Sequence, residues 1–132
     1  MKPRTHRSII IAAIAALSFS ANSFSHHSFA AVFDAEKPVE ASGTVTEVEW
    51  MNPHAWIYID VVGEDGETVN WAFELGSPNG LMRRGWTRKS VQVGDKISVT
   101  GYLARDGSNR GNIKSIVLAD GKELTGNSSN YR

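Results

Sequence analysis

The chain has 132 residues with 14 basic and 14 acidic side chains, four histidines and no cysteine. Thiolate metal sites, disulfides, redox pairs and cysteine nucleophiles are therefore excluded. Without disulfides, the stability of the fold must come from a hydrophobic core, and a closed β structure of about this size can supply one.

Residues 1–25 have the layout of a cleaved export signal. Three basic residues precede the short apolar run IIIAAIAAL, as in a secretory signal peptide. This run is too short to cross a bilayer, which needs about 20 apolar residues, so no membrane span is expected. Small residues permit cleavage after Ser25 or after Ser23. We therefore expect a periplasmic or secreted protein.

Cleavage after Ser25 leaves 107 residues with 11 basic and 14 acidic side chains, a formal charge of −3. This length fits one domain, and its acidic balance argues against nucleic acid as a partner. The expected organisation is an export signal at 1–25, an N-terminal arm at 26–38, a β domain at 39–120 and a flexible tail at 121–132. The tail is assigned because it has little apolar surface to bury.

Apolar and polar residues alternate with period two in most of the mature chain, which predicts strands. Five such strands are expected, at 39–50, 55–62, 69–75, 97–103 and 113–118. Between the third and the fourth, Ser77 and Pro78 supply a hydroxyl cap and a proline suited to the first helical position. Gly85 can end this helix after about two turns.

Five strands with one short helix after the third is the order of an OB-fold, a small Greek-key barrel. The fold class expected is thus an all-β, OB-like barrel, with a plain five-stranded sandwich or roll as the alternative. Ligands of OB-folds usually meet the loops that join strands one to two and four to five. Here these loops are Met51–His54 and Arg105–Asn112.

Three histidines of the exported portion suggest a metal site. After cleavage at Ser25, the amine and ring of His26 can chelate one ion, and His27 or His54 can complete an all-nitrogen set. Such a set favours Cu(II), then Zn(II) or Ni(II). After cleavage at Ser23, His26 would stand third in a terminal motif that binds Cu(II) or Ni(II) in a square plane. The alternative is that the terminal pair is merely solvated and that His54 caps a turn.

Four aromatic residues lie on the first three expected strands: Trp50, Trp56, Tyr58 and Trp71. Most of them are expected in the core. Trp56 and Tyr58, however, share the parity of Asp60 and thus the polar side of their strand. Together with Arg105 and Arg110, they are candidates for binding a flat ligand or a protein partner.

Several short motifs resemble those of one protein family. They are His26-His27-Ser28-Phe29, Phe33-Asp34, Trp50-Met51-Asn52-Pro53-His54, Gly76-Ser77-Pro78 and Arg84-Gly85-Trp86. In these motifs the chain resembles a family of small exported bacterial proteins known as domain of unknown function 6152. The resemblance covers essentially all of the mature domain. It implies a periplasmic β domain that begins at His26, which favours cleavage after Ser25, and it implies no activity.

Three functional hypotheses follow. The first is a non-enzymatic periplasmic domain that binds copper through His26, His27 and His54. The second is an OB-like module without metal that recognises a periplasmic protein or a small ligand through Trp56, Tyr58 and the loop Arg105–Asn112. The third is a copper-dependent oxidative enzyme. No catalytic residue is assigned, because no serine has an evident base and acid arranged around it and the carboxylates fall on expected solvent faces or in turns.

Overall fold

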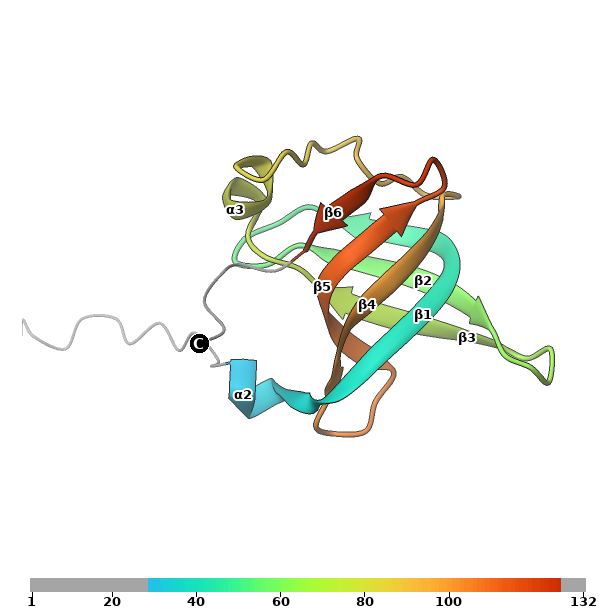
Figure 1. Ribbon diagram of the computed structural model, residues 1–132. Helices are drawn as coiled ribbons and strands as arrows, with labels where there is room; N and C mark the ends of the chain where they lie inside the picture. Colours follow the sequence, from blue (N-terminus) through green and yellow to red (C-terminus); the bar gives the residue numbers. More distant parts are fainter. Residues whose placement is uncertain (1–28, 127–132) are drawn as a thin grey trace, which may run out of the picture.

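The structure, a computed structural model, describes residues 29–126. The predicted signal peptide, both cleavage sites, His26, His27 and residues 127–132 lie outside the described residues. The described part forms a single closed β structure with two short helices at its periphery (Figure 1). Its elements are α2 (Phe29–Val32), β1 (Phe33–Glu49), β2 (Trp56–Val62), β3 (Thr68–Glu74), α3 (Pro78–Met82), β4 (Lys96–Ala104), β5 (Arg110–Leu118) and β6 (Glu123–Thr125).

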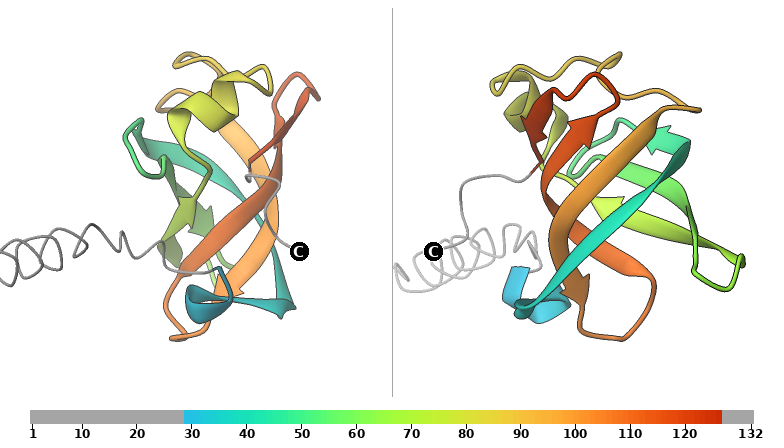
Figure 2. Two further views of the ribbon diagram at one scale, coloured as in Figure 1. Left: turned by 90° about the vertical axis from the view of Figure 1, so that its left-hand side faces the viewer. Right: turned by 45° about the vertical axis from the view of Figure 1, so that its right-hand side comes forward.

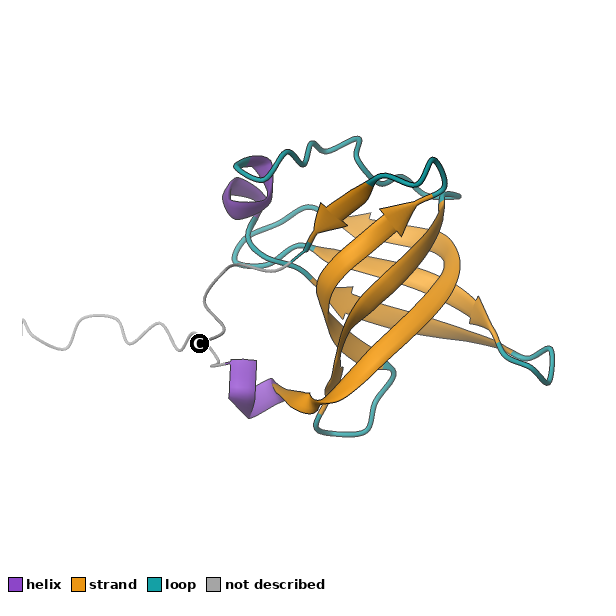
Figure 3. Cartoon of the chain, in the orientation of Figure 1, coloured by secondary structure: helices purple, strands orange, loops and turns teal. Residues whose placement is uncertain are grey.

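The strands follow the order β3-β2-β1-β4-β5-β6, and a pairing between β3 and β5 closes the ring. The closing pair is parallel, whereas the other pairs are antiparallel. The long strand β1 serves both sides of the barrel, since it pairs with β4 along its first part and with β2 along its last part (Figure 3). This closure, with α3 between β3 and β4, confirms the predicted OB-like barrel rather than a sandwich.

The barrel interior is filled by alternate residues of the strands, as the period-two pattern predicted. Ile57 and Ile59 of β2, Phe73 of β3 and Leu75 directly after β3 are at most 1% exposed. Full burial of such a side chain stabilises the fold by about 1.5–3 kcal/mol. Intervening residues therefore point outward, where the candidate site is built.

Two glycines allow the strands to approach closely where the barrel closes. A Cβ at Gly101 of β4 would overlap the backbone carbonyl oxygen of Asn112 on β5. A Cβ at Gly111 would lie 2.8 Å from the ring of Phe73, a separation that real Cβ atoms essentially never show. Glycine at these positions thus lets β5 lie against both β4 and the Phe73 ring.

The helix α3 begins as predicted but is shorter than expected, since it ends at Met82, three residues before Gly85. The Ser77 hydroxyl accepts a hydrogen bond from the backbone N–H of Gly80 at 3.2 Å, with Pro78 at the first helical position. Leu81 is fully buried and holds the helix against the barrel end. Gly85 follows with a φ of +89°, which glycine adopts without strain.

Both ends of the barrel domain differ from the expected organisation. At the start, residues 29–32 of the predicted arm form α2, and β1 begins at Phe33 rather than near residue 39. At the end, a sixth strand, β6, lies within the stretch expected to be a flexible tail. It pairs with β5, and its Leu124 is only 5% exposed. One leucine among polar residues gives no periodicity, so backbone pairing rather than pattern determines this strand.

Candidate functional site

The loop that joins β1 to β2 is tied to the segment that follows β3. The backbone N–H of Ala55 donates to the carbonyl of Gly76 at 3.1 Å, and the N–H of Leu75 donates to the carbonyl of Ala55 at 2.8 Å. The Asn52-Pro53 peptide earlier in this loop is cis. These bonds extend the β2–β3 ladder by one step, and they place His54 beside Glu74 at the end of β3.

His54 and Glu74 are in direct contact: Nδ1 of the ring touches Oε1 of the carboxylate. The His54 side chain is 35% exposed and that of Glu74 is 15% exposed. Nδ1 itself is shielded from solvent. The exposure of this side chain therefore comes from atoms other than Nδ1.

Glu74 belongs to a line of side chains that crosses four strands on the outside of the barrel. It stands opposite Trp56 on β2 and opposite Asn112 on β5, and Asn112 stands opposite Tyr102 on β4. Side chains at directly opposed positions share one face of a sheet. We call Trp56, Glu74, Asn112 and Tyr102 the outer row. Asn112 is only 1% exposed although it belongs to this outward face.

The helix α2 packs on Tyr102, at the end of the outer row opposite Trp56. The ring of Phe29 in α2 lies 5.6 Å from that of Tyr102, edge to face, and 5.6 Å from that of Phe33, stacked at 30°. Such ring pairs stabilise beyond their buried area. Phe29, three residues after His26, is therefore held on the same face as Glu74. The two views of Figure 2 show α2 and the β1–β2 loop from different sides.

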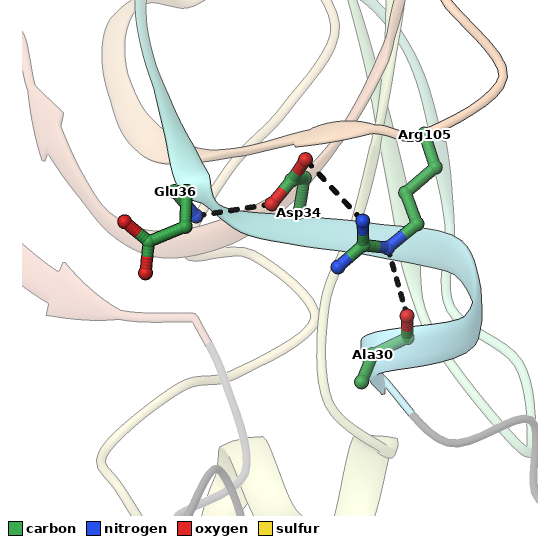
Figure 4. Close-up of polar contacts among 4 residues, drawn as sticks. All are labelled: Ala30, Asp34, Glu36 and Arg105. Carbon is green, nitrogen blue, oxygen red and sulfur yellow. Dashed lines mark hydrogen bonds and ion pairs between the residues drawn. The ribbon is translucent and has the colours of Figure 1, made fainter.

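A cation from the β4–β5 loop fixes the same segment. Nε of Arg105 donates to the carbonyl of Ala30 at 2.8 Å, and its Nη1 lies 3.4 Å from Oδ2 of Asp34 (Figure 4). The backbone N–H of Arg105 also donates to the carbonyl of Val32 at 2.8 Å. Asp34 accepts a further bond from the N–H of Glu36 at 3.2 Å. We call these contacts the arm anchor.

Three residues that the sequence predicted as binding residues form a cluster: Trp56, which belongs to the outer row, Tyr58 and Arg110. The guanidinium of Arg110 lies 5.2 Å from the centre of the Trp56 ring, within the range of a cation–π contact. The hydroxyl of Tyr58 donates to Oε2 of Glu49 at 3.2 Å. Burial raises the pKa of this hydroxyl above its usual value, and the charge of Glu49 and the hydrogen bond to it raise the pKa further.

The structure thus unites some predicted site residues and separates others. Trp56, Tyr58 and Arg110 lie together, and Trp56 and Tyr58 lie outside the hydrophobic core, as their parity predicted. Trp50 and Trp71 pack against the core, as expected of most of the aromatic residues. Arg105 lies apart from this cluster, because its guanidinium serves the arm anchor.

Sequence reasoning missed Glu74 and Phe29. Glu74 lies between the buried residues Phe73 and Leu75, so strand parity places it outward. Its contact with His54 depends on the β2–β3 register, which parity alone does not give. Phe29 lay in a segment without sustained periodicity, and its place in the His26-His27-Ser28-Phe29 motif gave it no role.

Within residues 29–126, no three side chains of His, Cys, Asp or Glu form a group able to hold a metal ion. In this part of the chain His54 and Glu74 are a pair, and the other two predicted ligands, His26 and His27, precede the described residues.

No helix in the described range is long and apolar enough to cross a membrane.

Fold and site define a small OB-like barrel with a histidine–carboxylate pair at the end of its β2–β3 ladder. The chain belongs to the family of unknown function DUF6152, whose model matches residues 13–114. This confirms the resemblance found from the motifs. The matched range includes the three histidines, Glu74 and the outer row. Among curated proteins, no match is found.

Proposed function

We propose that the chain is exported and that the mature protein is a non-enzymatic domain that binds a transition metal, copper in preference, through His26, His27 and His54. His54 supplies the ligand from the barrel. The terminal histidine pair supplies the others from the arm. The observation that supports this proposal is the position of Phe29, which follows the two terminal histidines closely in sequence and lies on Tyr102 of the outer row, the row that also holds Glu74, the contact of His54.

The distances along this face are short enough for His26 and His27 to meet an ion bound at His54. From Tyr102 through Asn112 to Glu74 the outer row crosses two strand spacings, which is about 10 Å. His27 precedes Phe29 by two residues and His26 by three, so extended chain can carry them roughly 7 and 10 Å from Phe29. The imidazole side chains add to this reach, and a shared ion beside Glu74 lies within it.

The arm anchor lowers the entropy cost of bringing the terminal histidines to His54. A free terminal arm would lose backbone entropy of about 1–2 kcal/mol for each residue that metal binding orders. Because Arg105, Asp34 and the Phe29 ring already fix residues 29–34, metal binding does not have to supply this cost for that part of the arm.

The chemistry of the donors favours copper. Imidazoles and an α-amine are nitrogen ligands, and nitrogen sites without thiolate bind Cu(II) more tightly than Zn(II) or Ni(II). The partly exposed side chain of His54 carries a second ring nitrogen, Nε2, that can bind such an ion. A carboxylate close to the ion would add favourable charge.

The experiment is native mass spectrometry of the full chain after export into a bacterial periplasm, before and after chelation. A mature chain that starts at His26 and carries one chelatable copper is expected. His54→Gln should lower the copper affinity by at least tenfold, whereas Glu67→Gln, in the exposed β2–β3 hairpin, should leave it unchanged. A chain that refuses added copper, or a His54→Gln variant that binds it as tightly as the unaltered chain, would overturn the proposal.

A second candidate function is an interaction module without metal. It is favoured by one observation: Trp56 and Tyr58 lie outside the core, and Arg110 covers the Trp56 ring. Aromatic and arginine side chains dominate the binding energy of many protein interfaces. For this module, Trp56→Ala should impair capture of a periplasmic protein and chelators should have no effect. Capture that persists in Trp56→Ala but is abolished by a chelator would exclude it.

A further inference from the structure

We propose that Glu74 is a positioning residue whose carboxylate, in contact with Nδ1 of His54, keeps the ring proton on that nitrogen, so that the lone pair of Nε2 faces outward as the metal-binding atom. The inference rests on the proposed function and assigns to Glu74 a role that the sequence did not indicate. Metal-binding histidines almost always donate their other ring N–H to a carboxylate, carbonyl or water, which fixes the ring and raises its basicity as a ligand.

The atoms of the His54 side chain differ in exposure. Nδ1 is buried and contacts the carboxylate. The side chain as a whole is 35% exposed, so solvent reaches atoms of it other than Nδ1. A neutral imidazole carries one proton, and a carboxylate oxygen in contact with one ring nitrogen favours the proton on that nitrogen, because two facing lone pairs would repel each other. Nε2 is then left as an acceptor of a metal ion rather than a donor.

Glu74 is well placed to hold the ring still. It stands within the ladder between Trp56 on β2 and Asn112 on β5, and its side chain is only 15% exposed. The buried neighbours Phe73 and Leu75 fix its backbone on either side. Its charge also favours a cation at the ring that it touches. A carboxylate on a rigid strand therefore restricts the ring of a residue that belongs to a loop.

Glu49 provides a matched control. It stands opposite Trp56 from the other side, on β1, in the same way that Glu74 stands opposite Trp56 from β3. Its carboxylate accepts the hydrogen bond of Tyr58 rather than one from a histidine. Glu49→Gln therefore removes an equal charge from the same face without changing the partner of His54.

The first test is the tautomer of His54 in the metal-free, exported chain, read from long-range ¹H–¹⁵N spectra of labelled histidine rings at pH about 8, above the usual histidine range of about 6.5. His54→Gln assigns the signals. The expected result is a proton on Nδ1 and none on Nε2, with Glu74→Gln shifting the ring toward the other tautomer and Glu49→Gln leaving it unchanged. A proton on Nε2 in the unaltered chain would overturn the inference.

The second test is copper affinity, measured by competition with a chelator. Glu74→Gln should weaken binding by about 10–100-fold, whereas Glu49→Gln should not change it. If the tautomer is as proposed but no variant binds copper, the positioning role stands and the proposed function fails. If copper binds but Glu74→Gln changes neither tautomer nor affinity, the proposed function stands and the role of Glu74 is refuted. Lost affinity with an unchanged tautomer would make Glu74 a direct ligand and would equally refute positioning.

Discussion

The β1–β2 and β4–β5 loops hold equivalent positions in OB-folds as ligand loops, yet this barrel uses their side chains differently. In the β4–β5 loop, Arg105 binds the carbonyl of Ala30 and the carboxylate of Asp34. In the β1–β2 loop, His54 contacts Glu74 through Nδ1, and its side chain remains 35% exposed. The β4–β5 loop thus binds residues of the chain's own arm, whereas the β1–β2 loop keeps a partly exposed histidine.

This difference shows that topology alone does not assign a ligand site. A fold indicates which loops can contact a ligand. Whether a side chain in such a loop can bind a ligand depends on the contacts that it already makes within the protein. Arg105 was a candidate for ligand binding from its loop alone. Its contacts with Ala30 and Asp34 make it a residue that positions the start of β1 and α2 instead.

The largest expected effect comes from the core beneath both loops. Phe73 is fully buried and lies against Gly111 and Trp71. Phe73→Ala should lower the free energy of unfolding by about 4 kcal/mol, because it leaves a cavity as well as removing apolar contact. Denaturant unfolding followed by tryptophan fluorescence measures this loss.

Val69→Ala provides the control for this change, since Val69 is on the same strand but 39% exposed. Its effect should stay within about 0.5 kcal/mol, as is usual for surface substitutions. Equal losses for the two variants would show that β3 does not carry the core, and that the two loops are held by other contacts.

An intermediate effect is expected at the arm anchor. Arg105→Gln removes the charged hydrogen bond to Ala30 and the ion pair with Asp34, which should cost about 1 kcal/mol of stability. Copper affinity should also fall, by roughly tenfold, because the arm is less often close to His54. The His54 tautomer should stay as it is. Denaturant unfolding, chelator competition and histidine ¹⁵N spectra measure the three quantities.

Arg88→Gln is the matched control, since Arg88 is an exposed arginine between α3 and β4 and lies outside the arm anchor. It should leave stability and copper affinity nearly unchanged. If Arg105→Gln destabilises the protein without weakening copper binding, the arm does not deliver ligands to the β1–β2 loop, and the contrast between the two loops is only structural.

The smallest effect concerns pH. Burial, followed by the charge and hydrogen bond of Glu49, raises the pKa of Tyr58. The folded state therefore holds this proton more tightly than the unfolded state, whose tyrosine pKa is about 10. The resulting stability is fully present below that value and is lost as pH rises through the higher folded pKa. Glu49→Gln should lower the folded pKa toward its usual value.

An alkaline titration of phenolate absorbance measures this change, and Tyr58→Phe identifies which signal belongs to Tyr58. If Glu49→Gln leaves the titration of Tyr58 where it was, the hydroxyl is controlled by burial alone. The cluster of Trp56, Tyr58 and Arg110 would then be electrostatically independent of β1.

The sequence predicted the barrel well because its signals are local. Alternation defined five strands, and Ser77 with Pro78 defined the helix between β3 and β4. The sixth strand escaped prediction because its pairing with β5 is a long-range backbone contact that leaves little trace in side-chain pattern. The early start of β1 escaped for the same reason, since residues near Phe33 pair with β4 from far along the chain.

The candidate site was only partly predictable. Parity placed Trp56 and Tyr58 outside the core, and the loop position singled out His54. The pairing of His54 with Glu74 could not be foreseen, because it requires the β2–β3 register and the hydrogen bonds around Ala55. The role of Arg105 was missed because its partners, Ala30 and Asp34, lie about 70 residues away in the sequence.

The position of Trp56 gives the protein a natural optical reporter. Its indole lies outside the core and directly across the ladder from Glu74, whereas Trp50, Trp71 and Trp86 pack in or against the interior. A paramagnetic ion bound at His54 would quench the emission of Trp56, because Trp56 stands directly opposite the residue that His54 contacts. Binding of such an ion at His54 can therefore be followed by intrinsic tryptophan fluorescence, without a label.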